Sequence, residues 1–139
     1  MSDEDIKEFR RETMKSVKTE TTTLALKVAK ELWRKGIRFR RNVEDLPGTP
    51  DIAIKKLKLV IFIDSCFWHG CKLHCKIPST NKEFWHSKIE RNRKIVEETN
   101  DYYINNGWTI LRIWEHDIRN NFDETINSIM ITIKELKGA

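Results

Sequence analysis

The sequence lacks any long apolar run, and it contains few residues that interrupt regular structure. Its 139 residues include five glycines and three prolines. No segment approaches the roughly 18 consecutive apolar residues of a membrane-spanning helix, so we predict neither a transmembrane segment nor a membrane partner. The N-terminal MSDEDIKEFRRE has no apolar stretch, which argues against a secretory signal peptide. We therefore expect a cytoplasmic protein whose thiols stay reduced.

Cysteine is also scarce, and its three copies all fall within CFWHGCKLHC at residues 66–75. An odd number of thiols does not make a disulfide framework, whereas thiolates interleaved with imidazoles are what a zinc ion binds, usually four in a tetrahedron. The clustering argues against three unrelated reduced cysteines. We predict a structural zinc site on this irregular loop, with ligands drawn from Cys66, Cys71, His74 and Cys75.

Apolar periodicity predicts strands and helices in the first half of the chain. Apolar residues recur at helical spacing from Leu24 to Trp33, and Gly36 is expected to end that helix. The elements expected next are a short strand at 37–40, a turn-rich loop at 42–50, a strand at 51–54 and a buried central strand at 59–63.

The second half predicts a long helix, a strand and a closing helix. Thr80 and Glu83 form a capping-box pattern that opens a helix ending near Gly107. Residues 108–114 are predicted to be another buried strand, and an apolar stripe over 126–136 predicts an amphipathic helix. We therefore predict one α/β domain over residues 21–139. It has a mixed sheet flanked by helices in the order αβββαβα, and a loosely attached arm at residues 1–20 precedes it.

Two carboxylates flank the predicted hairpin. Asp51 begins one strand and Asp64 ends the next, so the hairpin brings them toward each other. Together with a backbone carbonyl such as that of Ile63, they form a hard oxygen site suited to Mg²⁺, which polarises a phosphodiester. The alternatives are that Asp51 is a turn residue and that Asp64 caps the following loop through its backbone N–H groups.

Two histidines are candidates for chemistry near these strand ends. His69 lies five residues beyond Asp64, where it can donate or accept a proton, bind a metal or remain a surface residue. His116 follows the strand at 108–114, and we expect the ends of both central strands to meet at one edge of the sheet. His116 is therefore a candidate for a remote zinc ligand.

Aromatic and basic residues accompany these groups. Phe67, Trp68 and Trp85 lie in or just after the cysteine loop. Rings of this size are normally buried, but on a pinned loop they can act as wedges between base pairs. The formal net charge of +5 suits a polyanionic partner, although it fits an ordinary solvated surface as well.

The motifs LPGTPD, VIFIDSCFWHGC, EFWHSKI and NNGWTILRIWEH, in this order, resemble the very-short-patch repair (Vsr-type) DNA mismatch endonucleases. The resemblance covers residues 14–118. It implies the αβββαβ core of PD-(D/E)xK restriction-endonuclease-like nucleases. It further implies a monomer that uses Mg²⁺ to nick duplex DNA 5′ to the T of a T·G mispair.

The resemblance also implies roles for the residues that match the family motifs. Asp51 corresponds to the metal-binding aspartate and His69 to the histidine that activates water. The residues implied to wedge into DNA are Phe67, Trp68 and Trp85. Those implied to hold zinc are Cys66, Cys71, His74 and His116, with Cys75 as an alternative to His74.

The chain departs from the family pattern at two acidic positions. Ala25 and Val96 stand where many members carry an acidic residue, which implies reduced activity. Mismatch nicking has two alternatives, and Ala25 and Val96 favour only the second of them. One is a related endonuclease that cuts paired DNA at a recognition sequence, and the other is a catalytically weakened, zinc-stabilised DNA-binding module.

Overall fold

The computed structural model describes residues 22–65 and 81–138, which form one α/β domain. Four strands make a mixed sheet in the order β1-β2-β3-β4. Their bounds are Arg40–Arg41 for β1, Ile52–Ile54 for β2, Leu59–Asp64 for β3 and Thr109–Trp114 for β4. The pairs β1–β2 and β2–β3 are antiparallel, and β3–β4 is parallel.

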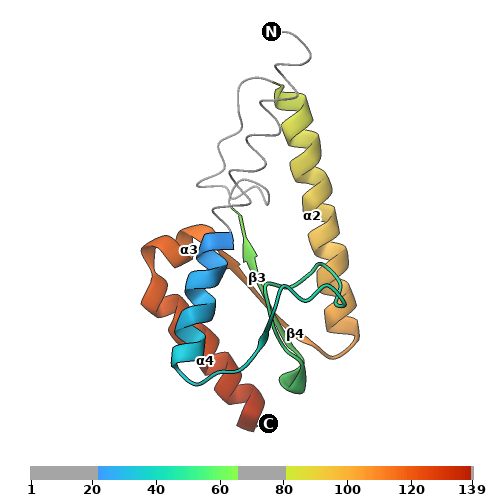
Figure 1. The fold of residues 1–139 in the computed structure, drawn as a ribbon. Coiled ribbons are helices and arrows are strands. Elements are labelled where there is room, and N and C mark those ends of the chain that lie inside the picture. The colour runs from blue at the N-terminus through green and yellow to red at the C-terminus, as the bar shows by residue number, and fades with distance from the viewer. Residues whose placement is uncertain (1–21, 66–80, 139) are drawn as a thin grey trace.

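Helices cover both faces of this sheet (Figure 1). The helices are a first one at residues 22–34, α2 (Lys82–Asn105), α3 (Glu115–Asn120) and α4 (Phe122–Gly138). Successive side chains of β3 point to opposite faces. Ile61 therefore packs with the first helix, α3 and α4, whereas Val60 and Phe62 pack with Tyr103 of α2. Because its side chains enter both clusters, β3 is the centre of both hydrophobic cores. Burying one such side chain contributes about 1.5–3 kcal/mol to stability.

The first helix ends as the sequence predicts, at Gly36. The N–H of Gly36 donates to Trp33 O and that of Ile37 to Leu32 O, each at 3.0 Å, with Gly36 at φ +91°. This is a Schellman motif, in which a left-handed glycine lets the chain reverse. Because the N–H of Ile37 serves this cap, strand pairing begins only at Arg40. The strand predicted at 37–40 is therefore wrong by three residues at its start.

The hairpin of β2 and β3 forms as predicted. A single 3-10 turn at Lys55–Leu57 and a left-handed Lys58 (φ +52°) reverse the chain between the strands. All six residues of β3 are buried, which agrees with its continuous apolar run. The helix α2 then crosses over and returns the chain to β4, which lies parallel to β3.

The helix α2 begins one residue later than a capping box at Thr80 requires. Its N-cap is Asn81, which is left-handed at φ +60° and makes no side-chain capping bond. Asparagine tolerates this conformation, whereas a capping threonine needs extended backbone. The N-terminal half of α2 extends past the ends of β3 and β4 (Figure 1).

The last strand and the last helices differ partly from the prediction. The strand predicted at 108–114 is present as β4, but the expectation that it is buried is wrong. Only Ile113 in it is buried, because β4 lies at the edge of the sheet. The short helix α3 was not predicted, and α4 buries Ile126, Ile129 and Ile133 as its stripe predicts. None of the helices in the described parts of the chain has the length and apolar composition needed to span a bilayer.

Candidate active site

A cavity of about 430 Å³ opens where the loop before β2, the end of β3 and the middle of α2 meet. The charged and amide side chains that line this carboxylate cavity are Asp51, Asp64, Lys88, Asn92 and Arg112. The predicted approach of the two carboxylates is therefore observed, because both line one cavity. The cavity also contains cationic groups, which are suited to a phosphate.

Asp51 is held by the neighbouring strand. Its Oδ2 accepts a hydrogen bond from the backbone N–H of Ile63 at 2.8 Å. Burial raises the pKa of the Asp51 carboxyl above its ordinary value, and the nearby charge of Asp64 adds to this rise. The bond from Ile63 and the charge of Arg41 lower the pKa and oppose the shift. Asp51 is thus a partly desolvated carboxylate with a defined orientation.

Asp64 forms an ion pair across the strands. Its Oδ1 lies 2.9 Å from Nη1 of Arg112, and the side chains are only 8% and 17% exposed. Nε of Arg112 donates to Oδ1 of Asn100 at 2.7 Å. The guanidinium also lies over the ring of Phe62, 4.3 Å from its centroid. Arg112 therefore ties Asp64, at the end of β3, to β4 and, through Asn100, to α2.

The loop that precedes Asp51 is fastened to α2. The hydroxyl of Tyr103 donates to the carbonyl of Pro47 at 2.6 Å. Gly48, at φ +75°, leaves no room for a side chain, because a Cβ there would lie 2.9 Å from Cγ2 of Thr99 and 3.2 Å from Phe62. This close approach lets the loop form one wall of the carboxylate cavity.

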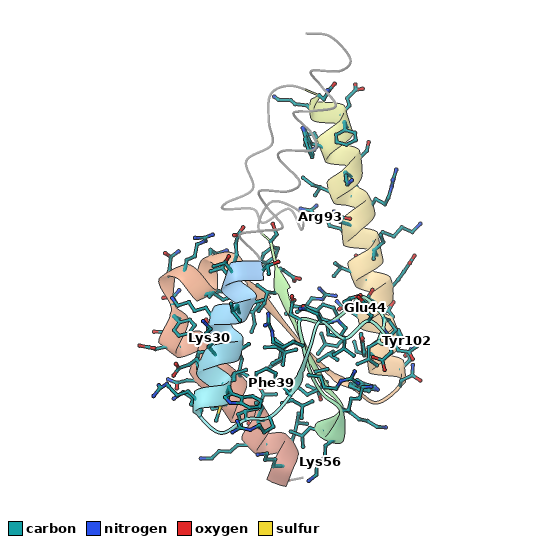
Figure 2. The ribbon with its side chains drawn as sticks, viewed as in Figure 1. Lys30, Phe39, Glu44, Lys56, Arg93 and Tyr102 are labelled. Carbon is teal, nitrogen blue, oxygen red and sulfur yellow. The ribbon has the colours of Figure 1, made fainter. Side chains whose placement is uncertain are left out.

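The helix α2 contributes a polar wall. Lys88 and Asn92 are four residues apart, so they lie on the same face and both line the cavity. A second hollow of about 350 Å³ adjoins the first, since Asp64, Val96 and Arg112 line both. Arg93 lines this second hollow, and Figure 2 shows it on the side of α2 toward the sheet. The helix therefore adds cations to both hollows.

The ends of β3 and β4 lie side by side, as predicted from the sequence. Asp64 pairs with Trp114 in the parallel register, so Cys66 and His116 each follow a paired strand end by two residues. His116 stacks on Trp114 with 6.0 Å between ring centroids, and its Nε2 lies 3.5 Å from Asp117 Oδ1. The candidate zinc ligands Cys66, Cys71, His74 and Cys75 lie outside the described residues.

No metal-binding cluster occurs in the described residues themselves. Within 22–65 and 81–138, no three His, Cys, Asp or Glu side chains are placed to hold an ion. His69, Phe67 and Trp68 also fall outside the described ranges. Trp85 is fully buried, with the ring of Phe84 at 4.8 Å, so it reaches a ligand only if the side chains covering it move.

The two positions where many family members are acidic differ from each other. Ala25 is 3% exposed and belongs to the apolar core beneath the first helix. Val96 lines both hollows beside Asp64 and Arg112. An acidic residue at Val96 would face the cavity, whereas a carboxylate at Ala25 would have to be buried among aliphatic side chains.

Three residues that line the cavity were not predicted from the sequence. Arg112 is the only charged residue in the strand TILRIW, and a lone cation in an apolar strand was a usable signal. Lys88 and Asn92 show no such signal, because α2 is rich in polar residues on every face. Their position depends on which face of the helix turns toward β3.

The protein is thus an α/β protein whose cavity contains two carboxylates and two cations. This arrangement is suited to binding and hydrolysing a phosphodiester. The model of the family "DNA mismatch endonuclease Vsr" matches residues 2–76, just over half of the chain. The Type II nicking enzyme V.HpaIIP of Haemophilus parainfluenzae is 44% identical over 117 residues, covering 82% of this chain and 83% of the relative.

Two further relatives indicate the same family. The DNA mismatch endonuclease Vsr of Escherichia coli is 34% identical over 126 residues, 86% of this chain and 77% of its own. The Type II nicking enzyme V.NmeDIP of Neisseria meningitidis serogroup C is 34% identical over 134 residues, 94% of this chain and 90% of its own. The chain therefore belongs to the Vsr family of DNA mismatch endonucleases, as its motifs predict. It is a DNA endonuclease, a hydrolase whose partner is DNA.

Proposed function

We propose that this enzyme nicks duplex DNA 5′ to the T of a T·G mispair, as a Mg²⁺-dependent step of very-short-patch repair. The observation that carries the proposal is the pair of carboxylates, Asp51 and Asp64, in a cavity that also presents Lys88 and Arg112. The names of the relatives, a mismatch endonuclease and nicking enzymes, support cleavage of one strand. The cations suit a phosphate whose charge increases during hydrolysis.

The donor set of the cavity fits Mg²⁺. Asp51 and Asp64 supply hard carboxylate oxygens, and Ile63, whose backbone carbonyl we propose as a further ligand, lines the same cavity. A magnesium ion held by these oxygens would supply electrostatic stabilisation of the charge that develops on the phosphate oxygens. Asp51 keeps its orientation through the bond from Ile63, and Lys88 offers a positive charge to the DNA backbone. We propose His69 as the group that takes a proton from water.

We propose that zinc fastens the loop that carries the DNA-reading aromatics. The thiols and imidazole of Cys66, Cys71 and His74 are zinc ligands by chemistry, with Cys75 as the alternative to His74. His116, in the first turn of α3, completes the set. The pairing of Asp64 with Trp114 supports this, because Cys66 and His116 each follow one of these neighbouring strand ends by two residues.

The zinc would pre-organise the wedge formed by Phe67 and Trp68. Inserting rings between base pairs costs a few kcal/mol of unstacking, and a weakened T·G pair lowers that cost. A loop already ordered by a metal loses less conformational entropy on binding. Trp85 joins this wedge only after it leaves its buried position.

The decisive experiment is nicking of a strand-labelled duplex containing one T·G mispair, with and without Mg²⁺. We expect one nick 5′ to the T, and no cleavage of the same duplex with a T·A pair. Cleavage of both duplexes would instead favour a sequence-specific endonuclease, and binding without cleavage a DNA-binding module. We also propose that the enzyme acts as a monomer, which light scattering of the DNA-bound protein tests.

The site assignment has a matched pair of variants. Asp51→Asn should lower the nicking rate by at least about 100-fold, since it removes a metal-binding charge. Asp45→Asn alters an aspartate six residues earlier that lies on the surface, paired with Lys55, and should leave the rate unchanged. Zinc is tested separately by elemental analysis of purified protein, where Cys66→Ser should reduce the bound zinc. Full zinc content in that variant would remove Cys66 from the ligand set.

A further inference from the structure

Arg112 is the cation that faces Asp64 inside the carboxylate cavity. It is the only charged side chain in β4, and it lies directly opposite Phe62 in the pairing with β3. The two charged side chains are 17% and 8% exposed, so the pair is largely withdrawn from water. A carboxylate as buried as Asp64 is strongly disfavoured without a compensating cation, and Arg112 supplies it.

Three contacts from different directions immobilise this guanidinium. Nη1 meets Asp64 Oδ1 at 2.9 Å, Nε meets Asn100 Oδ1 at 2.7 Å, and the ring of Phe62 lies beneath at 4.3 Å. The planar fork of arginine allows these contacts to form together, which a lysine cannot reproduce. We call these three contacts of Arg112 the clamp. Because Asn100 comes from α2, the clamp joins the sheet to α2.

The surface ion pairs of the chain provide a contrast. Lys55 meets Asp45 at 2.8 Å, and Arg93 meets Glu90 at 3.2 Å, but in both pairs each side chain is at least 40% exposed. Such pairs contribute little to structure, because water screens them and their side chains stay mobile. The Asp64–Arg112 pair is instead buried, is anchored by Asn100 and lines the same cavity as Asp51. These features indicate a role in the candidate active site and not merely in the charge of the surface.

We propose that Arg112 is a positioning residue for hydrolysis: it fixes Asp64 from across the sheet, so that the carboxylate faces Asp51 in a defined geometry. The inference rests on the proposed function, in which both carboxylates serve the reaction. Arg112 acts through Asp64 and need not touch DNA. Its loss should slow the chemical step and leave DNA affinity unchanged, because misplacing one group by about 1 Å can cost about 100-fold in rate.

The competing role, direct contact with a DNA phosphate, makes different predictions. A phosphate contact should contribute to affinity and to its dependence on salt, whatever residue occupies position 64. A positioning role should vanish once Asp64 is gone, because residues that act through one another have non-additive effects. A double-mutant cycle therefore separates the two roles.

The experiment compares wild type, Arg112→Gln, Asp64→Asn and the double variant on the T·G duplex. Single-turnover rates are measured at saturating protein and Mg²⁺, and dissociation constants without metal. We expect Arg112→Gln to slow nicking about 10- to 100-fold with an unchanged dissociation constant, and to cause no further loss in the Asp64→Asn background. Arg34→Gln, which alters an exposed arginine paired with Glu31, is the matched control and should not change the rate.

Three results would overturn the proposal. They are a normal nicking rate for Arg112→Gln, a loss of rate that persists in the Asp64→Asn background, and weaker DNA binding by Arg112→Gln. Asn100→Ala covers the possibility that Arg112→Gln fails to fold, since it keeps both charges and removes only the anchor. Asn100→Ala should lower the nicking rate less than Arg112→Gln does, and it should cause no loss in the Asp64→Asn background. A normal nicking rate for Asn100→Ala would count against the clamp.

A readout independent of cleavage separates this inference from the proposed function. Urea unfolding midpoints of the same four proteins report whether Asp64 and Arg112 are coupled in the folded chain. We expect the double variant to lose less stability than the two single variants together. If wild type does not nick the T·G duplex but this coupling is found, the proposed function fails while the pairing stands. Additive midpoints would overturn the clamp itself.

Discussion

The backbone N–H of Ile63 donates a 2.8 Å hydrogen bond to the side chain of Asp51, so β3 orients the carboxylate that precedes β2. The ladder between these strands ends at the pair Ile52–Ile61, and the main chain of Asp51 turns away to accept a bond from Asn42. The side chain therefore takes the place of a ladder acceptor. The carboxylate that we propose for the reaction is in this way positioned by β3, whose six residues are all buried.

Asp51→Asn should change activity and stability in opposite directions. Asparagine can still accept the bond from Ile63, but it carries no charge in a site where burial disfavours one. We expect the variant to lose nicking and to have a higher urea midpoint than wild type at neutral pH. A lower midpoint there would show that burial of the Asp51 charge does not cost stability.

The pH dependence of that gain follows from the raised pKa. Because the pKa of Asp51 is higher in the folded chain than its ordinary value of 3.8, protonation favours folding. This contribution is fully present below pH 3.8 and is lost as pH rises through the folded pKa. Asp51→Asn should therefore exceed wild type in stability at neutral pH, and the difference should vanish in acid.

Asp45→Asn supplies the opposite sign as a control. The hydrogen bond from Lys55 lowers the pKa of Asp45, so its ionised form favours folding. That contribution is present above the ordinary pKa and is lost as pH falls through the lowered one. A small loss of stability at neutral pH is expected, in contrast to the gain at Asp51. Equal shifts in both variants would indicate a general effect of net charge.

The sequence predicted the carboxylate pair but not the groups around it, and the reason is physical. Asp51 and Asp64 mark the ends of a hairpin whose two strands are adjacent in the chain, so local pattern is enough to bring them together. Lys88 and Asn92 enter through the packing of a distant helix, where no local rule sets the rotation. The order of the strands was enough to predict that the end of β4 lies beside the end of β3. The partial exposure of β4 was not predicted, because it results from the position of β4 at the edge of the sheet.

Gly48→Ala should damage both the fold and the cavity. An added Cβ would lie 2.9 Å from Thr99 and 3.2 Å from Phe62, and the residue is at φ +75°. Left-handed backbone costs alanine about 1 kcal/mol, and the clash adds about 1–3 kcal/mol. We expect a lower urea midpoint and slower nicking, because Gly48 lines the carboxylate cavity.

Gly107→Ala isolates the backbone part of that effect. Gly107 has φ +77°, almost the same as Gly48, but a Cβ there would meet nothing within 4 Å. Its substitution should cost only the backbone term and leave the nicking rate normal. Equal losses of stability at both glycines would show that the contacts with Thr99 and Phe62 relax without cost.

Tyr103→Phe should loosen the loop that forms one wall of the cavity. The hydroxyl of Tyr103 donates to Pro47 O at 2.6 Å, and its loss should cost about 1 kcal/mol in the free energy of unfolding. Burial raises the pKa of Tyr103 to about 12, so the neutral phenol favours folding. The difference between wild type and variant should be constant below pH 10 and disappear as pH rises through about 12. A difference that changes between neutral pH and pH 10 would assign the effect to another group.

The basic edge strand β1 should guide the DNA backbone toward Asp51. Arg40 and Arg41 are exposed, they pair with Ala53 and Ile52, and the charge of Arg41 reaches the Asp51 carboxyl. If each neutralises one phosphate, replacing it with glutamine should reduce the slope of log K against log salt by about 0.9. Fluorescence anisotropy with a T·G duplex at several salt concentrations measures this slope.

The matched control for these substitutions is Lys56→Gln. Lys56 is exposed on the 3-10 turn before β3, at the end of the sheet far from the carboxylate cavity (Figure 2). Because a charge there should not meet a phosphate of DNA bound at Asp51, the slope should stay at its wild-type value. A reduced slope for Lys56→Gln together with normal slopes for the arginine variants would place the duplex along the opposite end of the sheet. That result would remove Asp51 from the cleavage site.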